Sequence, residues 1–232
     1  MDALQRIFAT YISKPLLKRR LRRTSYYHLG HLHFEIDPGI FHPRYFFSSE
    51  YLADFVKRLD LTGKTVAEPC TGSGLIGLIA REKGAHVSCS DIDERAVNCA
   101  TKNHARNSKR FPETGSWRIF HSDLFDNYPP QLRFDIIIIN PPYFFKPQEK
   151  PEQLAWNCGS EGEFFEKLFQ QIPSRTRRHS KVYLILAENC EIERIIKIAG
   201  KYGIGLIQVE ERKIKWEKNY IFVTEYSNQT HE

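Results

Sequence analysis

The chain has 232 residues, of which 41% are hydrophobic and 27% are charged. This composition is typical of a folded globular protein and excludes a disordered polymer, and the length suits one α/β domain with an appendage. Lysine and arginine outnumber aspartate and glutamate by 34 to 28, a formal net charge of +6, which favours an acidic partner such as nucleic acid.

The cysteines, the aliphatic runs and the N-terminus exclude further classes of protein. The five cysteines are widely spaced and include no C-x-x-C pair, so we expect a reducing compartment and no bound metal. The longest aliphatic run, Ile136–Ile139, is far shorter than the roughly 18 residues of a membrane span. The N-terminus lacks a secretory signal pattern, and Asp2 argues against a mitochondrial presequence. We therefore expect a cytoplasmic protein without membrane contact.

The first 45 residues are predicted to form a basic extension ahead of the main domain, which spans 46–232. Apolar residues in 4–11 recur at helical spacing, and the basic run Lys14–Arg23 follows them. Apolar residues alternate in 31–36, which predicts a half-buried strand, and the turn signal Asp37-Pro38-Gly39 closes it.

The main domain alternates between strand and helix patterns. Ser48 or Ser49 is predicted to cap a helix whose apolar face includes Leu52 and Val56. The predicted strands are 65–68, 86–90, 117–121, 134–140, 181–187, 205–210 and 220–226, and the predicted helices are about 74–83, 93–106, 161–171 and 191–201. This alternation indicates a doubly wound, Rossmann-like α/β sheet, mostly parallel, with helices on both faces. The last two strands have no helix between them, so we expect an antiparallel hairpin at one edge.

A glycine-rich loop, Gly72–Gly77, follows the first of these strands and opens a helix. The literal G-x-G-x-x-G pattern is typical of a dinucleotide site, which leaves a NAD-dependent dehydrogenase as one alternative. However, Glu68–Thr71 separates the strand from the first glycine, whereas a pyrophosphate-binding turn begins at the strand end. A carboxylate at the strand tip suits a cofactor with an ammonium group rather than phosphates. S-adenosylmethionine fits that description.

Two more carboxylates follow the next two strands. Asp91 ends the second strand, where its carboxylate can accept both ribose hydroxyls of an adenosine, and Asp123 ends the third, where it can bind the adenine amino group. Cys70 lies beside the glycine loop. Because no histidine near it in sequence would make it a thiolate, we interpret Cys70 as a buried filler rather than a nucleophile.

The most informative segment is Asp135–Tyr143, in which four isoleucines are followed by Asn-Pro-Pro-Tyr. The isoleucines predict a central strand, and the prolines end it and fix the turn after it. The side-chain oxygen of Asn140 and the carbonyl of Pro141 can accept both hydrogens of a planar NH₂ group, and the ring of Tyr143 can stack on it. Two acceptors stabilise the charge that develops when such a nitrogen takes a methyl group.

These segments together resemble class I S-adenosylmethionine-dependent methyltransferases of the HemK/PrmC-like group, which have a small methyltransferase domain. The resemblance covers about residues 40 to 226 and implies that the chain is an N-methyltransferase. By position, it implies that Glu68, Gly72 and Gly74 bind the methionine part of the cofactor, that Asp91 binds the ribose, and that Asp123 binds the adenine. It further implies that Asn140, Pro141 and Tyr143 hold the target nitrogen, with Asn140 also bordering the cofactor.

From the Asn-Pro-Pro-Tyr turn and the resemblance, we expect the acceptor to be a planar amide or amino nitrogen of a macromolecule. Overall resemblance favours a protein glutamine, as in release-factor methyltransferases, although the basic extension stands here in place of the N-terminal helical bundle of those enzymes. The alternative acceptor is an exocyclic amine of adenine or guanine in RNA or DNA. The basic run Lys14–Arg23 would then contact nucleic acid, as would the clusters His104–Arg110 and Arg175–Arg178. A non-catalytic binding module with the cofactor fold is the other alternative, and the intact Asn-Pro-Pro-Tyr turn argues against it.

Overall fold

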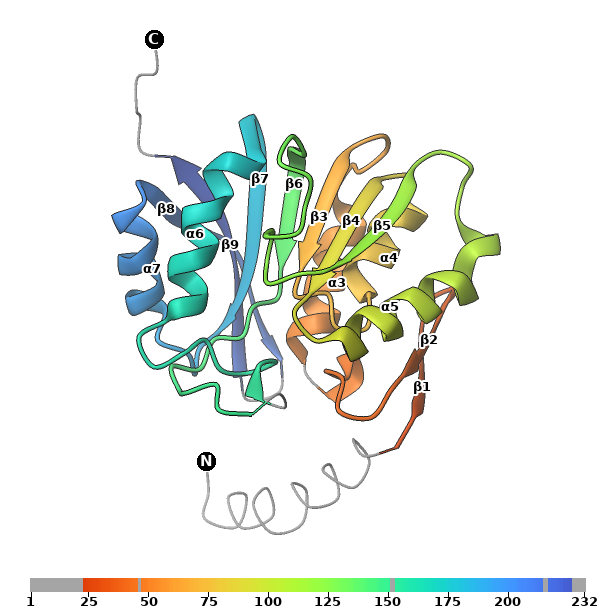
Figure 1. The fold of residues 1–232 in the computed structure, drawn as a ribbon, viewed down its shortest axis with the longest axis horizontal. Helices are drawn as coiled ribbons and strands as arrows, with labels where there is room; N and C mark the ends of the chain where they lie inside the picture. The colour runs from red at the N-terminus through yellow and green to blue at the C-terminus, as the bar shows by residue number, and fades with distance from the viewer. Residues whose placement is uncertain (1–22, 46, 151–152, 215–216, 227–232) are drawn as a thin grey trace.

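The computed structural model describes residues 23–45, 47–150, 153–214 and 217–226. Seven strands of this part form one sheet in the order β5-β4-β3-β6-β7-β9-β8 (Figure 1). These strands are β3 (Thr65–Pro69), β4 (His86–Asp91), β5 (Ser116–His121), β6 (Phe134–Ile139), β7 (Thr176–Ala187), β8 (Ile204–Ile214) and β9 (Glu217–Tyr226). The pairs from β5 to β7 are parallel, and β9 is antiparallel to both β7 and β8. The predicted parallel sheet with an antiparallel edge hairpin is confirmed.

Helices cover both faces of this sheet. The helices are α3 (Phe47–Arg58), α4 (Leu75–Glu82), α5 (Glu94–Asn107), α6 (Glu163–Arg175) and α7 (Ile192–Lys201). One hydrophobic cluster joins α3, α4 and α5 to the sheet, and a second joins α6 and α7 to its other face. The isoleucines of β6 alternate between the two: Ile138 belongs to the first cluster, and Ile137 and Ile139 to the second. Because successive side chains of a strand point to opposite faces, a central strand needs this unbroken apolar run.

A two-stranded hairpin precedes the sheet. The strand predicted at 31–36 is confirmed as β2 (Leu32–Ile36), and it pairs antiparallel with β1 (Ser25–Leu29), which the sequence did not predict. Phe34 and Tyr27 pack into the same cluster as α3, α4 and α5. The boundary at residue 45 stays a prediction. The helix predicted over 4–11 and the basic run to residue 22 lie outside the described residues.

The predicted cap of α3 is wrong. Ser48 and Ser49 both lie inside the helix, which begins at Phe47, and both are buried. The expected apolar face is present, because Leu52 and Val56 are fully buried in the first cluster. Ser49 lies in the first turn, and its hydroxyl accepts a hydrogen bond from Asn140 after β6 instead of capping the helix.

Candidate active site

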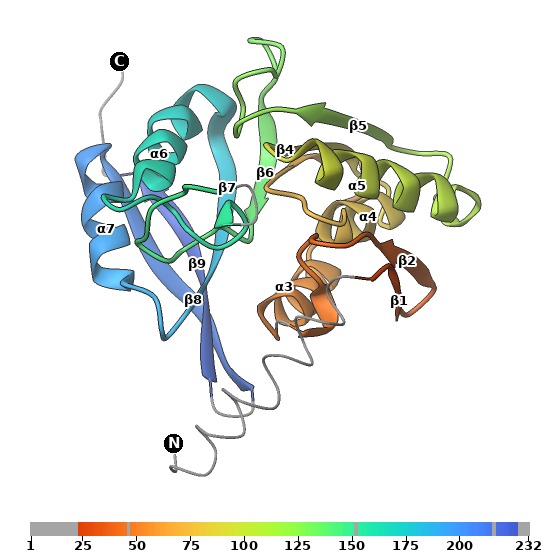
Figure 2. The ribbon, with the colours of Figure 1, turned by 60° about the horizontal axis from the view of Figure 1, so that its bottom comes forward.

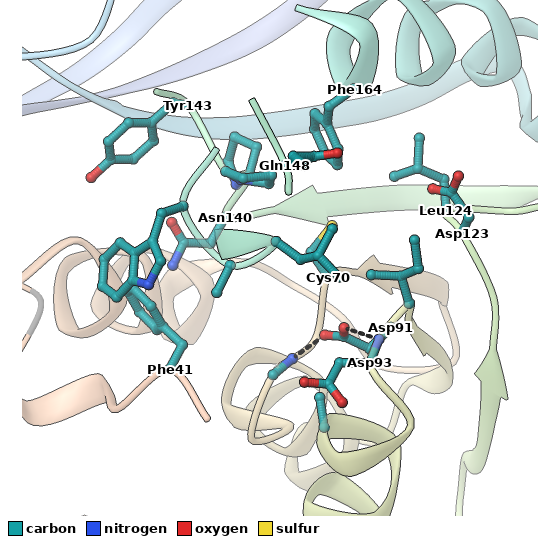
Figure 3. A pocket seen from close by; sticks show the side chains of 18 of the residues that line it. Phe41, Cys70, Asp91, Asp93, Asp123, Leu124, Asn140, Tyr143, Gln148 and Phe164 are labelled. Carbon is teal, nitrogen blue, oxygen red and sulfur yellow. Dashed lines mark hydrogen bonds between the residues drawn. The ribbon is translucent and has the colours of Figure 1, made fainter. Parts of the chain in front are cut away.

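A cavity of about 230 Å³ opens at the carboxyl ends of β3, β4 and β6. Loops that leave the same edge of a parallel sheet converge, so residues distant in sequence meet there. The predicted site residues that line the cavity are Gly72, Asp91, Asp123, Asn140, Pro141 and Tyr143, whereas Glu68 and Gly74 do not line it. Figure 3 shows Asp91 and Asn140 on different sides of Cys70. The chain thus gathers most of the predicted site residues around one cavity.

Glu68 lies beneath the glycine loop. Its Oε2 accepts hydrogen bonds from the Gly77 amide at 2.8 Å, from the Cys89 thiol at 3.4 Å and from the Thr71 hydroxyl. Burial raises the pKa of Glu68 to about 7. A Cβ at Gly77 would lie 2.5 Å from the Cys89 sulfur and 2.8 Å from Glu68 Oε2, so only glycine fits. Glu68 therefore braces the glycine loop from inside.

The backbone around the cavity is held in the left-handed region at several points. Gly72 and Gly74 have φ of 55° and 83°, and the Gly74 amide donates to the Thr71 carbonyl at 2.9 Å. Two non-glycine residues in the described part have positive φ, Cys70 and Leu124, and both line the cavity. Backbone strain of this kind clusters at functional sites. Burial raises the pKa of the Cys70 thiol, which agrees with its interpretation as unreactive. The expectation of a buried filler is wrong, because Cys70 is half-buried and lines the cavity.

Asp91 presents its carboxylate at the end of β4. Its Oδ2 accepts the Gly72 amide at 2.9 Å, and its Oδ1 accepts the Asp93 amide at 3.0 Å (Figure 3). Each oxygen keeps a lone pair after these bonds, so the carboxylate can accept two more donors from the cavity. Burial raises the pKa of Asp91 to about 6. The two backbone amides fix the carboxylate in an orientation that suits a vicinal diol.

Asp123 lies across the cavity and is paired. Lys167 of α6 donates to Asp123 Oδ2 at 2.5 Å and to Asp126 Oδ2 at 2.6 Å. Lys167 also lines the cavity, so this rim of the site carries a cation between two carboxylates. Asp123 can accept an adenine amino group through its other oxygen, Oδ1, while the ion pair stays in place.

Asn140 follows β6, lines the cavity and contacts α3. Its Nδ2 donates to the Ser49 hydroxyl at 3.4 Å, and this contact orients the amide so that Oδ1 is the acceptor left for a ligand. Pro141 and Pro142 are buried and fix the turn. The residues that follow the strand therefore present an acceptor at the cavity, as the Asn-Pro-Pro-Tyr pattern predicts.

Aromatic rings from separate segments line the same cavity as this acceptor. Phe41 precedes α3 and Trp156 lies in the loop after β6, and their ring centroids are 5.1 Å apart. Tyr143 and Phe164 also line the cavity. Tyr143 contacts Phe144 edge to face, and burial raises the pKa of its phenol. A planar ligand group beside Asn140 would contact several ring faces.

The loop after β6 folds back over the cavity through its backbone. The Phe144 amide donates to the Trp156 carbonyl at 2.9 Å, and the Cys158 amide donates to the Phe144 carbonyl at 2.8 Å. The Asn157 side chain donates to the Pro147 carbonyl at 2.7 Å. These bonds return Trp156 to the strand end that carries Asn140.

A family comparison decides what kind of protein has this site. The model of the methyltransferase small domain matches residues 31–161, more than half of the chain. The chain belongs to the methyltransferase small domain family. Its similarity to the tRNA1(Val) (adenine(37)-N6)-methyltransferase of Pedobacter heparinus is 31% identity over 165 residues, which cover 68% of each chain. The release factor glutamine methyltransferase of Thermodesulfovibrio yellowstonii is 27% identical over 84% of this chain and 75% of its own length.

Solved structures share the fold of this methyltransferase. The T. thermophilus 16S rRNA N2 G1207 methyltransferase, solved with S-adenosylmethionine and guanosine, matches with a TM-score of 0.61 at 18% identity, covering 88% of this chain and 50% of that one. The E. cuniculi Mtq2–Trm112 complex, responsible for methylating the termination factor eRF1, matches with a TM-score of 0.59 at 21% identity, covering 82% of this chain and 99% of that one. Both likenesses support the predicted class I methyltransferase fold.

Several cavity residues of this methyltransferase were not predicted from the sequence. They include Phe41, Gln148, Trp156, Phe164 and Lys167, and the contact of Ser49 with Asn140 was not predicted either. One signal was available, because tryptophan is rare in this chain and Trp156 stands in a segment without strand or helix periodicity. Within the described ranges, no group of His, Cys, Asp and Glu could hold a metal ion. None of the helices described is long and apolar enough to cross a membrane.

Proposed function

We propose that this enzyme is an N-methyltransferase that transfers the methyl group of S-adenosylmethionine to the exocyclic amine of an adenine in RNA. The main observation in support of this proposal is that several aromatic rings line the same cavity as Asn140. Phe41, Tyr143 and Trp156 come from separate segments and line the cavity that Asn140 borders. A flat, aromatic acceptor uses such a surface fully, because bases are held in enzyme pockets by stacking as well as by hydrogen bonds.

S-adenosylmethionine is the methyl donor of this methyltransferase, and it supplies an electrophilic methyl group on a sulfonium. The cavity fits its adenosine part, because Asp91 offers two carboxylate oxygens held by the amides of Gly72 and Asp93. We propose that Asp91 accepts the ribose hydroxyls, that Asp123 accepts the adenine amino group, and that Gly72 lets the backbone approach the methionine part. Glu68 and Gly74 would support this part of the site by shaping the loop.

On the acceptor side, the chain supplies two hydrogen-bond acceptors. Asn140 Oδ1 and the Pro141 carbonyl would take the two hydrogens of the amine, which directs the nitrogen lone pair at the methyl group. Because both acceptors oppose the positive charge that grows on nitrogen, they stabilise the transition state more than the ground state. The ring of Tyr143 adds to this effect when it stacks on the base.

A protein glutamine is the second candidate acceptor. It is supported by the release factor glutamine methyltransferase of T. yellowstonii, which aligns over 84% of this chain. The amide of glutamine is planar and can occupy the same two acceptors. It presents much less surface to the rings of the cavity than a purine does. This point favours the base.

The acceptor can be identified by following a labelled methyl group. Full-length enzyme and labelled S-adenosylmethionine are added to RNA and, separately, to protein from cells of its own organism. We expect label in RNA, recovered after nuclease digestion as N6-methyladenosine. Asn140→Ala should abolish that label, whereas Asn98→Ala, an exposed asparagine on α5, should not. Label recovered only from the protein fraction, as methylglutamine, would contradict the proposal and support the second candidate.

A further inference from the structure

The β1–β2 hairpin, the end of α5 and the 3-10 turn that follows it (Ser108–Arg110) form one surface, which we call the hairpin surface: Tyr26, His28, His33, Arg106, Lys109 and Arg110. Figure 2 shows the hairpin beside α5. Two buried asparagines of α5 join them. Asn103 Oδ1 accepts the Glu35 amide at 2.8 Å and Asn107 Oδ1 accepts the His33 amide at 2.9 Å. Asn103 also donates to the Glu35 carbonyl, and Asn107 also donates to the His33 carbonyl. The hairpin is thus fixed to the helix, and its outward side chains are fixed relative to the cavity.

The hairpin surface carries excess positive charge. Two carboxylates in and just after β2 are already paired, Glu35 with Arg106 and Asp37 with Lys102. Lys109 and Arg110 are exposed, and neither lies within ion-pair distance of a carboxylate in the part of the chain that the structure describes. Partial burial, together with the nearby Arg110, His28 and Arg106, lowers the pKa of His33. A polyanion would therefore find two cations without competing partners here.

The same surface presents an aromatic ring to solvent. Tyr26 is 64% exposed, and the guanidinium of Arg106 lies 5.8 Å from its ring centroid. Tyr27, its neighbour, is buried, as expected for alternation along a strand. An exposed ring flanked by arginine is a platform on which an unpaired base can stack.

We propose that the hairpin surface binds the RNA strand that delivers its adenine to the cavity. This inference rests on the proposed function. Helix α5 connects the two places, since Asp93 and Ala96 at its start line the cavity and its last residue, Asn107, lies beneath the hairpin. At about 1.5 Å per residue, its 14 residues span roughly 21 Å. For a strand that keeps the stacked rise of about 3.4 Å per nucleotide, the surface contacts phosphates roughly six nucleotides from the target base.

Charge reversal tests the proposal in the full-length enzyme. Lys109→Glu with Arg110→Glu should weaken binding of an RNA oligonucleotide at least about tenfold at moderate salt. It should also lower the slope of log affinity against log salt by about 1.4, the loss of two single-strand phosphate contacts. The matched control is Lys64→Glu with Lys181→Glu, the same change in net charge on two exposed lysines at the side of the sheet where β3 begins, away from the cavity. That control should bind RNA as the wild type does.

Four further outcomes decide the matter. The neutral pair Lys109→Ala with Arg110→Ala should give a smaller loss in the same direction, which keeps the test valid if charge reversal disturbs folding. An RNA that ends within three nucleotides of the target adenine should bind wild type and charge-reversed enzyme equally. If wild type methylates RNA but both charge-reversed pairs bind it alike, the hairpin surface is refuted and the proposed function stands. If wild type neither binds nor methylates RNA, the proposed function itself fails.

Discussion

Glu68 is a buried carboxylate and Asp91 a half-buried one, both at or near strand ends, and their surroundings differ in which oxygens remain available to a ligand. Oε2 of Glu68 accepts hydrogen bonds from Gly77, Thr71 and Cys89, all within the protein. Asp91 receives one backbone amide on each oxygen and lines the cavity. The sequence pattern placed a carboxylate at each strand end, but it could not distinguish a brace from a ligand-facing group, because that depends on which donors the folded loop brings near.

The ligand-facing role of Asp91 predicts a loss of cofactor affinity on truncation. Asp91→Ala should weaken binding of S-adenosylhomocysteine by about 1.5–3 kcal/mol, the range for hydrogen bonds to a charged group. Calorimetry on wild type and variant measures the difference. Wild-type affinity in the variant would show that the ribose is held elsewhere.

The same carboxylate should make cofactor binding depend on pH. Burial raises the pKa of Asp91 to about 6, and its ionised form is the better acceptor for two hydroxyl donors. Protonation below that pKa therefore removes an acceptor, so affinity for S-adenosylhomocysteine should fall as the pH drops from 7.5 to 5. Asp91→Asn, which cannot ionise, should bind weakly with a flatter profile. Equal wild-type affinity at both pH values would contradict this account.

Asn140 should separate chemistry from binding. If its Oδ1 contacts the acceptor nitrogen, Asn140→Ala should lower turnover by about two to three orders of magnitude, as expected for a lost transition-state partner. Cofactor affinity should change little, because Asp91 and the glycine loop remain intact. Single-turnover rates and calorimetry on the same preparation test both halves. Full activity in the variant would mean that the turn is only structural.

At the scale of elements, α5 stabilises the hairpin through Asn103 and Asn107. Each side chain is buried and exchanges two hydrogen bonds with one residue of β2. Replacing either by alanine leaves a backbone amide and a carbonyl of the strand without their partners, so unfolding free energy should fall by about 1–3 kcal/mol. Urea titration measures it. Thr101→Ala, an exposed change on the same helix, should stay within about 0.5 kcal/mol of wild type; equal effects for all three would contradict the role of the asparagines.

Elements with a clear period were predictable from the sequence, and those fixed by distant partners were not. The aliphatic run of β6 and the apolar face of α3 predict directly which residues are buried. In β1, two adjacent tyrosines mask the alternation, and only pairing with β2 determines which of them is buried. The start of α3 was misjudged because Ser49 meets Asn140, a residue 91 positions away.

At the scale of the whole molecule, the parallel sheet brings residues that are far apart in the sequence together at one site. Asp91, at the end of β4, and Asn140, just after β6, lie at the same edge of the sheet, because neighbouring parallel strands end together. Phe41 and Trp156 reach that edge from loops whose course depends on backbone bonds, such as that between Phe144 and Trp156. No local pattern encodes such bonds, so the rings that favour a base became visible only in the folded chain.

The central claim is that this enzyme methylates adenine in RNA, and the nucleosides of RNA from living cells test it most directly. RNA is isolated from cells that lack the gene and from the same cells supplied with wild type or Asn140→Ala, then digested and measured by mass spectrometry. The account predicts that one N6-methyladenosine position is lost without the gene, restored by wild type and not restored by Asn140→Ala. Unchanged N6-methyladenosine in all three, with a methylglutamine lost from protein instead, would contradict it.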